Sequence, residues 1–191
     1  MRLLFLGPPG AGKGTQAMRV AERLGLAHVS TGEMFRQHVA DGTDLGMKVD
    51  AIMKSGDLVP DELTIAMLEE RITHDDAAGG YILDGFPRTL TQAQALDEHL
   101  GANGLDAVVV LDVAEEELVG RMMSRGRKDD TEESIRNRLR VYAADTMPLI
   151  AFYAARDIVA SVDGVGELDD ITVRILSVIE GGSGGGQNRT V

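Results

Sequence analysis

A glycine-rich stretch near the start of the chain has the residue types and spacing of a phosphate-binding loop: Gly7-Pro8-Pro9-Gly10-Ala11-Gly12-Lys13-Gly14-Thr15. It follows an apolar run and opens a helical pattern, which is the context that such a loop requires. Glycines let successive backbone N–H groups surround an anion, and the helix N-terminus adds a favourable dipole. We expect Lys13 to reach the outer phosphates of a nucleotide. Because Gly14 stands where Ser or Thr usually follows the lysine, Thr15 is the candidate for the magnesium or phosphate contact.

A carboxylate that could work with this loop ends the apolar run Tyr81-Ile82-Leu83-Asp84. A buried strand that ends in Asp beside a phosphate loop predicts a magnesium site. Mg²⁺ keeps several of its waters in proteins, so we expect Asp84 to hold the ion through water. The alternative is that Asp84 only caps the turn before Gly85.

Arginines form the third chemical group. Arg88 follows the Asp84 turn and falls at the carboxyl edge of the expected sheet, where ligands bind in open α/β folds. Guanidinium groups match phosphate oxygens in pairs and stay charged at any working pH. Further arginines outside the expected strands are Arg36, Arg121, Arg125, Arg127 and Arg138. The alternative is that each forms a solvated salt bridge, which is the interpretation we adopt for Arg71, Arg136 and Arg140.

The elements that must position these side chains follow from hydrophobic patterning. Apolar, β-branched runs predict strands at residues 3–6, 27–29, 81–83, 107–111 and 158–162. Helical spacing lies between them, at residues 14–24, 61–73, 90–100, 115–123, 131–155 and 168–179. This alternation predicts an α/β fold with a parallel sheet covered by helices on both faces. Gly25 should end the first helix, Ser30 and Glu33 have capping-box spacing, and Pro148 should kink or divide the long helical stretch.

The 191 residues favour one domain, which we place at residues 1–180. Its core comprises residues 1–29, 61–120 and 131–180. Two segments interrupt the alternation of strands and helices: a helical insert at residues 30–60 and a brief charged loop at residues 121–130. Residues 181–191 are rich in Gly and polar residues, which is typical of a disordered tail.

Composition excludes several classes of function. The chain has 31 acidic and 19 basic residues, a net charge of −12, which disfavours non-specific binding to nucleic acid or anionic membranes. It has no cysteine, so disulfides, thiolate chemistry and cysteine metal sites are excluded. The four histidines are scattered, and we expect them on helix surfaces or in loops rather than as ligands. No apolar run approaches the roughly 20 residues of a membrane span, and the N-terminus does not resemble a signal peptide, so a cytoplasmic setting is expected.

Taken together, the motifs resemble those of the adenylate kinase family, whose members transfer phosphate from ATP to AMP. The matching residues keep the family's order and spacing over nearly the whole chain: Gly7 to Thr15, Ser30-Thr31-Gly32, Leu58-Val59-Pro60, Asp84-Gly85-Phe86-Pro87-Arg88, Gln92 and Arg127-Lys128-Asp129-Asp130. The resemblance implies a P-loop fold with five parallel strands, a helical AMP-binding insert and a lid. It also implies Mg²⁺ bound with ATP, and a monomer.

The resemblance also implies roles for single residues. Those implied to bind ATP are Gly10, Ala11, Gly12, Lys13, Gly14, Thr15, Arg121, Arg125 and Gly166, the last through its main chain. Those implied to bind AMP are Thr31, Gly32, Arg36, Leu58, Val59, Gly85, Arg88, Gln92, Arg127 and Arg138. Lys13, Arg88, Arg127 and Arg138 would stabilise the transferred phosphoryl group. Asp129 would anchor the lid.

The chain departs from longer family members at the lid, where three residues separate Met123 from Arg127. It therefore resembles the short-lid type, and without cysteine it cannot carry the zinc of some long lids. Short lids also occur in uridylate/cytidylate kinases, but these usually have Ala where this chain has Thr31. A hydroxyl there can bond the acceptor base, which favours AMP. A non-catalytic nucleotide switch or a plain ATPase remains an alternative from another class.

Overall fold

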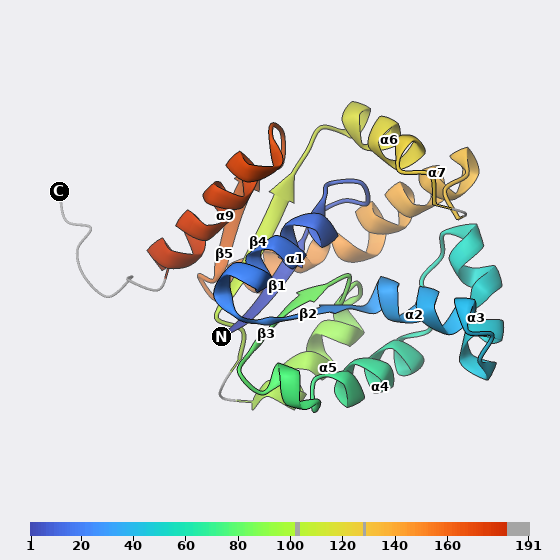
Figure 1. Ribbon diagram of the computed structural model, residues 1–191, viewed down its shortest axis with the longest axis horizontal. Coiled ribbons are helices and arrows are strands. Elements are labelled where there is room, and N and C mark those ends of the chain that lie inside the picture. Colours follow the sequence, from blue (N-terminus) through green and yellow to red (C-terminus); the bar gives the residue numbers. More distant parts are fainter. Residues whose placement is uncertain (102–103, 128, 183–191) are drawn as a thin grey trace.

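The structure, a computed structural model, describes residues 1–101, 104–127 and 129–182. All five strands are parallel and lie in the order β2-β3-β1-β4-β5 (Figure 1). Their bounds are β1 Arg2–Leu6, β2 Ala27–Ser30, β3 Tyr81–Asp84, β4 Ala107–Asp112 and β5 Val159–Asp163. The predicted strands are confirmed. The first and last residue of each strand lie within one residue of the predicted positions. The order of the strands, which local patterns do not reveal, places β1 at the centre.

Helices cover both faces of the sheet, as the sequence predicts. The helices that pack on one face are α1 (Lys13–Leu24), α6 (Glu115–Ser124), α7 (Glu132–Val141) and α9 (Leu168–Gly182). Those on the other face are α4 (Asp61–Arg71), α5 (Leu90–Leu100) and α8 (Pro148–Ala154). A short turn of 3₁₀ helix, η1, spans Asp75–Ala77. Among the helices that the structure describes, none is long and apolar enough to cross a membrane.

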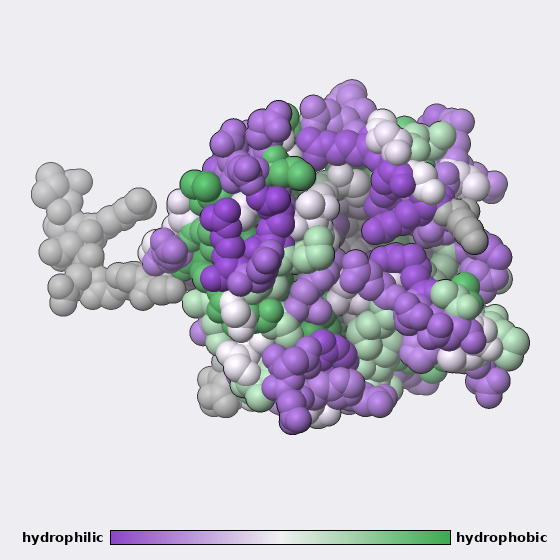
Figure 2. All heavy atoms as spheres, in the orientation of Figure 1, coloured by the Kyte–Doolittle hydropathy of each residue, from purple (hydrophilic) through white to green (hydrophobic). Residues whose placement is uncertain are grey.

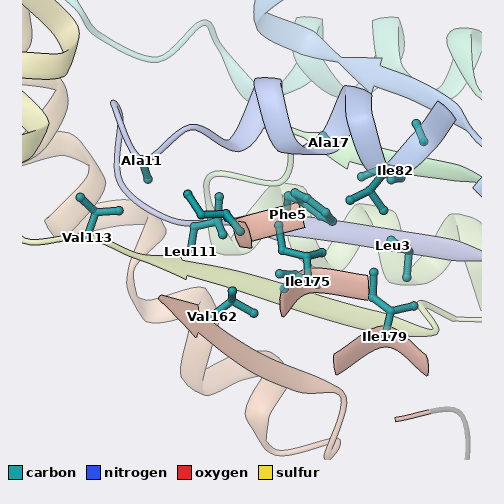
Figure 3. Close-up of a cluster of buried hydrophobic side chains, with 14 of the residues drawn as sticks. Leu3, Phe5, Ala11, Ala17, Ile82, Leu111, Val113, Val162, Ile175 and Ile179 are labelled. Atoms are coloured by element: carbon teal, nitrogen blue, oxygen red, sulfur yellow. The ribbon is translucent and has the colours of Figure 1, made fainter. Parts of the chain in front are cut away.

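The strand β1 divides the core into two clusters by the alternation of its side chains. Leu3 and Phe5 pack toward α1 and α9, where they meet Ile175 (Figure 3). Leu4 and Leu6 point the other way, toward α4, α5 and α8. Because both faces of β1 are apolar and covered, the strand is a continuous hydrophobic run, which is why its sequence predicts a buried parallel strand.

The insert has a hydrophobic cluster of its own. Its helices are α2 (Thr31–Ala40) and α3 (Asp44–Ser55), and no strand lies between them. Phe35, Val49, Val59 and Met67 are all buried in this third cluster, the last from α4. The insert is therefore built on its own packing and joins the sheet through the carboxyl end of β2 and the start of α4.

Three local predictions need correction. Ser30 is the N-cap of α2, but its side chain makes no capping hydrogen bond; the residue also ends β2, where it pairs with Asp84 of β3. The charged loop predicted from residue 121 begins later, since α6 continues to Ser124 and buries Met122 in the core. Helix α9 continues to Gly182, into the predicted tail; residues 183–191, like Lys128, lie outside the described residues.

The long helical stretch is divided, as Pro148 predicts. Between α7 and α8 the chain forms a π turn, η3, at Tyr142–Thr146, in which Met147 N donates to Tyr142 O at 2.8 Å. Pro148 then opens α8 at a first-turn position, where its missing N–H costs no hydrogen bond. The proline therefore lies at a boundary between helices rather than inside one.

The packing of α9 gives a stability prediction. Ile175 is 0% exposed between the sheet and α1, so Ile175→Ala should lower the free energy of unfolding by about 2–5 kcal/mol. Val173 lies on the same helix but is 54% exposed, and Val173→Ala should change stability by no more than about 0.5 kcal/mol. Urea denaturation of both variants measures the difference. Equal losses would contradict this account of the core.

Candidate functional site

Three neighbouring strands, β2, β3 and β1, end at the same level. The loops that follow them therefore begin at one edge of the sheet. Asp84 of β3 pairs with Phe5 of β1 on one side and with Ser30 of β2 on the other. A cavity of about 520 Å³ opens beyond these strand ends. Figure 2 shows hydrophilic residues on both sides of a recess between the α6–α7 segment and the α2–α3 segment. The volume is in the range of pockets that bind small ligands and cofactors.

This cavity gathers almost every residue that the sequence analysis selects. Its lining includes Gly10, Gly12, Lys13, Gly14, Thr15, Thr31, Gly32, Arg36, Leu58, Val59, Asp84, Gly85, Arg88, Gln92, Arg121, Arg125, Arg127 and Arg138. Ala11 and Gly166 do not line it. The methyl group of Ala11 is buried in the core, and its backbone N–H donates to Pro8 O within the loop at 3.1 Å.

The glycine-rich loop has the backbone geometry of an anion cradle. Gly10 and Gly12 both have left-handed φ angles, +89° and +93°, which side chains other than glycine rarely adopt. Gly12 is also the N-cap of α1, and it offers no side chain to the first amides of the helix. The N-terminal N–H groups of α1 therefore remain available to an anion, which the helix dipole also favours.

Lys13 is held inside this loop. Its Nζ donates to Gly7 O at 2.7 Å and to Pro8 O at 2.9 Å. Burial lowers the pKa of Lys13 to about 8, an effect that Asp84 opposes and that Arg88 and Arg125 reinforce. The ammonium group is thus poorly compensated in the free protein and would gain from the approach of a polyphosphate.

Asp84 lies at the junction of β3 and the phosphate loop, where a Cβ atom on Gly14 would be 3.1 Å from its Oδ2. Burial alone would raise the pKa of Asp84, but His28, Lys13 and Arg88 together lower it, so the carboxylate is ionised at neutral pH. Thr15 lines the same cavity. An ionised carboxylate and a hydroxyl are hard oxygen donors, which fit Mg²⁺ coordinated largely through water. Within the described ranges, no three His, Cys, Asp or Glu side chains gather as a direct metal site.

Arg88 is fixed by contacts to its main chain and its guanidinium group. Gln92 Oε1 accepts from Arg88 N at 2.7 Å, and Thr146 Oγ1 donates to Arg88 O at 2.9 Å. The Nε of Arg88 donates to Gly85 O at 2.7 Å. Burial lowers the pKa of Arg88, and the neighbouring charge of Arg138 adds to this effect. The guanidinium group is therefore oriented before any ligand binds.

The arginines of the short loop after α6 share acidic partners. Asp130, whose side chain is 1% exposed, accepts from Arg125 Nε at 2.5 Å and from Arg138 Nη1 at 2.7 Å. Arg138 also pairs with Asp129 and donates to Met53 O of the insert at 3.2 Å. Arg138 thus links α7, the loop and the insert.

Two further arginines face the cavity with less compensation. Burial lowers the pKa of Arg36 and of Arg127, and for Arg127 the charges of Arg36 and Arg125 add to this effect. Arg125 lowers the pKa of both groups, and Arg36 also lowers that of Arg127, so several positive charges lie close together in the lining of the cavity. Such a field favours a ligand with several negative charges.

Comparison with known proteins agrees with this geometry. A sequence model of the family described as adenylate kinase matches residues 5–158, more than half of the chain.

The chain belongs to the adenylate kinase family.

Its relatives match it over nearly their full length. It is 54% identical to an adenylate kinase of Stenotrophomonas maltophilia (strain R551-3), over 95% of this chain and 100% of the relative. It is 51% identical to an adenylate kinase of Mycolicibacterium vanbaalenii, over 94% of this chain and 99% of the relative. An adenylate kinase of Kocuria rhizophila is 48% identical over 94% and 98%. The resemblance inferred from the motifs is confirmed.

The structure adds residues that the sequence analysis missed. Asp61 of α4 accepts from Gln92 Nε2 at 2.7 Å and from Thr89 Oγ1 at 2.9 Å, so it orients the residue that holds the Arg88 main chain. Thr146, in the π turn, donates to the Arg88 carbonyl. The local sequence around Asp61 and Thr146 carries no signal of these contacts, because each joins residues at least 28 positions apart.

The prediction that the histidines lie on helix surfaces or in loops is wrong for His28. This residue lies in β2, and its Nε2 is 3.4 Å from Asp84 Oδ2. The pairing of β2 with β3 brings the two side chains together, since His28 aligns with Ile82, two residues before Asp84. An alternating strand places both residues on the same face, which a reading of each run alone does not reveal.

The low pKa of Lys13 predicts a proton linkage. Below pH 8 the free protein carries protonated Lys13, and above it the proton is lost. Bound polyphosphate favours the ammonium form and raises this pKa, so ATP binding above pH 8 should take up a proton. The affinity for ATP should then fall by up to about tenfold for each pH unit above 8. Calorimetric titration with ATP in buffers of different ionisation enthalpy measures the uptake.

The control for this titration is Lys13→Met, which removes the titrating group and should show no such uptake. Equal proton uptake in both proteins would assign the linkage to another group.

Proposed function

We propose that this member of the adenylate kinase family catalyses the reversible, Mg²⁺-dependent transfer of the terminal phosphoryl group of ATP to AMP, which gives two ADP and balances the adenine nucleotides. The observation that carries the proposal is the convergence of one lysine and several arginines on a single cavity between the phosphate loop and the insert. A protein that bound one nucleotide as a switch would need only the phosphate loop. The additional cationic wall at Arg36 and Arg88 suits a second anionic substrate.

On the donor side, the loop residues Gly10, Ala11, Gly12, Lys13, Gly14 and Thr15 would hold the phosphates of ATP. Arg121 and Arg125 would cover them from the α6 side, and the main chain at Gly166 would support the adenine. This assignment is supported by the uncapped N-terminus of α1 and by the buried ammonium group of Lys13.

On the acceptor side, the residues proposed to bind AMP are Thr31, Gly32, Arg36, Leu58, Val59, Gly85, Arg88, Gln92, Arg127 and Arg138. Thr31 Oγ1 donates its proton to Gly85 O at 2.9 Å, which leaves the hydroxyl oxygen as an acceptor. An acceptor at this position suits a base with an exocyclic amino group. Gln92 would act through Arg88, because both ends of its amide are already bonded within the protein.

The transfer itself requires no general base, since the attacking phosphate oxygen of AMP is already ionised near neutral pH. Catalysis would consist of placing two nucleotides in line and countering the charge of the moving group. Lys13, Arg88, Arg127 and Arg138 are the residues proposed to counter it. Mg²⁺, held through water by Thr15 and Asp84, would neutralise further phosphate charge when bound with ATP. The segments at residues 30–60 and 121–130 would close over AMP and ATP and exclude water that could hydrolyse ATP.

The setting we propose is a cytoplasmic monomer whose partners are ATP, AMP and ADP, without nucleic acid, membrane or structural zinc. The net charge of −12 supports the absence of nucleic acid and anionic membranes, because an acidic chain disfavours non-specific binding to polyanions. The lack of any cysteine excludes thiolate ligands for zinc.

The acceptor can be tested by incubating the protein with MgATP and AMP, CMP or UMP and following ADP. We expect AMP to react at least about tenfold faster than either pyrimidine nucleotide, because a site built around one base discriminates against others. A reaction without acceptor measures hydrolysis. Preference for CMP or UMP would support the alternative acceptors, and ADP formation independent of any acceptor would contradict the proposal.

The role of Arg88 gives a second test. Arg88→Ala should lower kcat by about 10²- to 10³-fold, since it removes an oriented cation from the transferred group. Its melting temperature should stay within a few degrees of that of the wild type, because burial makes the charged guanidinium group unfavourable in the free protein. Arg140→Ala removes an exposed arginine and serves as the control. Near-normal turnover of Arg88→Ala would exclude the role.

A further inference from the structure

The end of β5 and the two residues that follow it are held by guanidinium groups from two helices. Arg174 of α9 donates from Nη1 to Asp163 O at 2.8 Å and to Val165 O at 2.9 Å. Between these two carbonyls, Gly164 O accepts from Arg121 Nη1 of α6 at 3.1 Å. Three successive carbonyl groups therefore have charged donors, which form stronger hydrogen bonds than neutral ones.

The amides of the same segment are also bonded. Gly164 N donates to Asp112 O of β4 at 2.8 Å, and Val165 N donates to the Asp163 side chain at 2.9 Å. Gly164 has no room for a side chain, because a Cβ atom there would lie 2.6 Å from Val113 Cγ2. The three carbonyl groups of residues 163–165 and the N–H groups of Gly164 and Val165 thus all have hydrogen-bond partners, although Val165 is on the surface.

The segment lies against the phosphate loop. A Cβ atom on Gly164 would be 3.6 Å from Ala11 O, so the turn and the loop are in direct contact. Gly166, which we assign to the adenine of ATP, is the next residue but one and has a φ of +121°. Any shift of residues 163–165 would move this main-chain support relative to the phosphates.

Arg121 and Arg174 differ in whether they also face the cavity. Arg121 lines the cavity and belongs to the residues proposed to bind ATP. If its guanidinium group turns to the nucleotide, Gly164 O loses its donor at the moment when the adenine must be supported. Arg174 is not part of the cavity lining; it lies near Asp163, with Nη1 3.7 Å from the carboxylate. It can hold the segment in both the free and the bound protein.

We propose that Arg174 is a positioning residue for the donor nucleotide: it fixes the carbonyls of Asp163 and Val165, and through them the main chain that supports the ATP base. This inference rests on the proposed assignment of that segment to ATP. Arg174 touches no reacting atom. It sets donor affinity and leaves the acceptor site and the transfer step unchanged.

The test compares Arg174→Met, which keeps an apolar stem but removes the donors, with Arg174→Lys, which restores a charged donor without the planar fork. In Arg174→Met the KM for ATP should rise by about tenfold, as expected for the loss of two charge-assisted hydrogen bonds that order the site. The KM for AMP and kcat should stay within about twofold of wild type. Arg174→Lys should fall between wild type and Arg174→Met. Arg136→Met removes an exposed arginine from α7 and is the matched control for charge.

A second measurement separates positioning of the base from general damage to the phosphate loop. Calorimetric binding of inorganic tripolyphosphate, which carries no base, should be the same in wild type and Arg174→Met, whereas binding of ATP should weaken. Equal weakening of both ligands, a parallel rise in the KM for AMP, or an unchanged KM for ATP would overturn the inference. If wild-type protein itself fails to convert ATP and AMP to ADP, the proposed function fails, which is a distinct result.

Discussion

The level at which β1, β2 and β3 end is the constraint on which the site depends. Phe5, Asp84 and Ser30 lie side by side across the sheet, so the loops that follow them start from a common edge. A slip of one residue in β3 would turn Asp84 to the opposite face, because successive side chains of a strand alternate. The apolar side chains of both faces prevent such a slip, since each has a place in one of the two core clusters.

This arrangement places cations where they destabilise the free protein. Burial lowers the pKa values of Lys13, Arg36, Arg88 and Arg127, which means that their charged forms are less stable there than in water. Asp84, Asp129 and Asp130 offset part of the charge. The remaining positive field suits a transition state in which negative charge spreads over a phosphoryl group, and the oriented donors need little rearrangement when that charge develops. The cavity is thus rich in positive charge, although the chain as a whole has a net charge of −12.

The sequence predicts those features that depend on neighbouring residues. The five strands, the glycine-rich loop and the arginines that line the cavity follow from local patterns and chemistry. Contacts between distant segments could not be predicted in this way: Asp61 with Gln92, Thr146 with the Arg88 carbonyl, and His28 with Asp84 all depend on how the strands and helices pack. Ser30 lies at the N-cap of α2, as its sequence context predicts, but its side chain makes no capping hydrogen bond and the residue pairs with Asp84 in the sheet.

The π turn at Tyr142–Thr146 has a consequence for the two helices that it joins. A turn closed by a bond from Met147 N to Tyr142 O contains one residue more than the corresponding α-helical turn. Without that residue α8 would be rotated by about 100° relative to α7. Arg138 on α7 faces the cavity, whereas Tyr153 on α8 is fully buried in the core. The extra residue therefore changes the rotation of α8 about its axis. As a result, the α7 part of the chain faces the cavity and the α8 part faces the core.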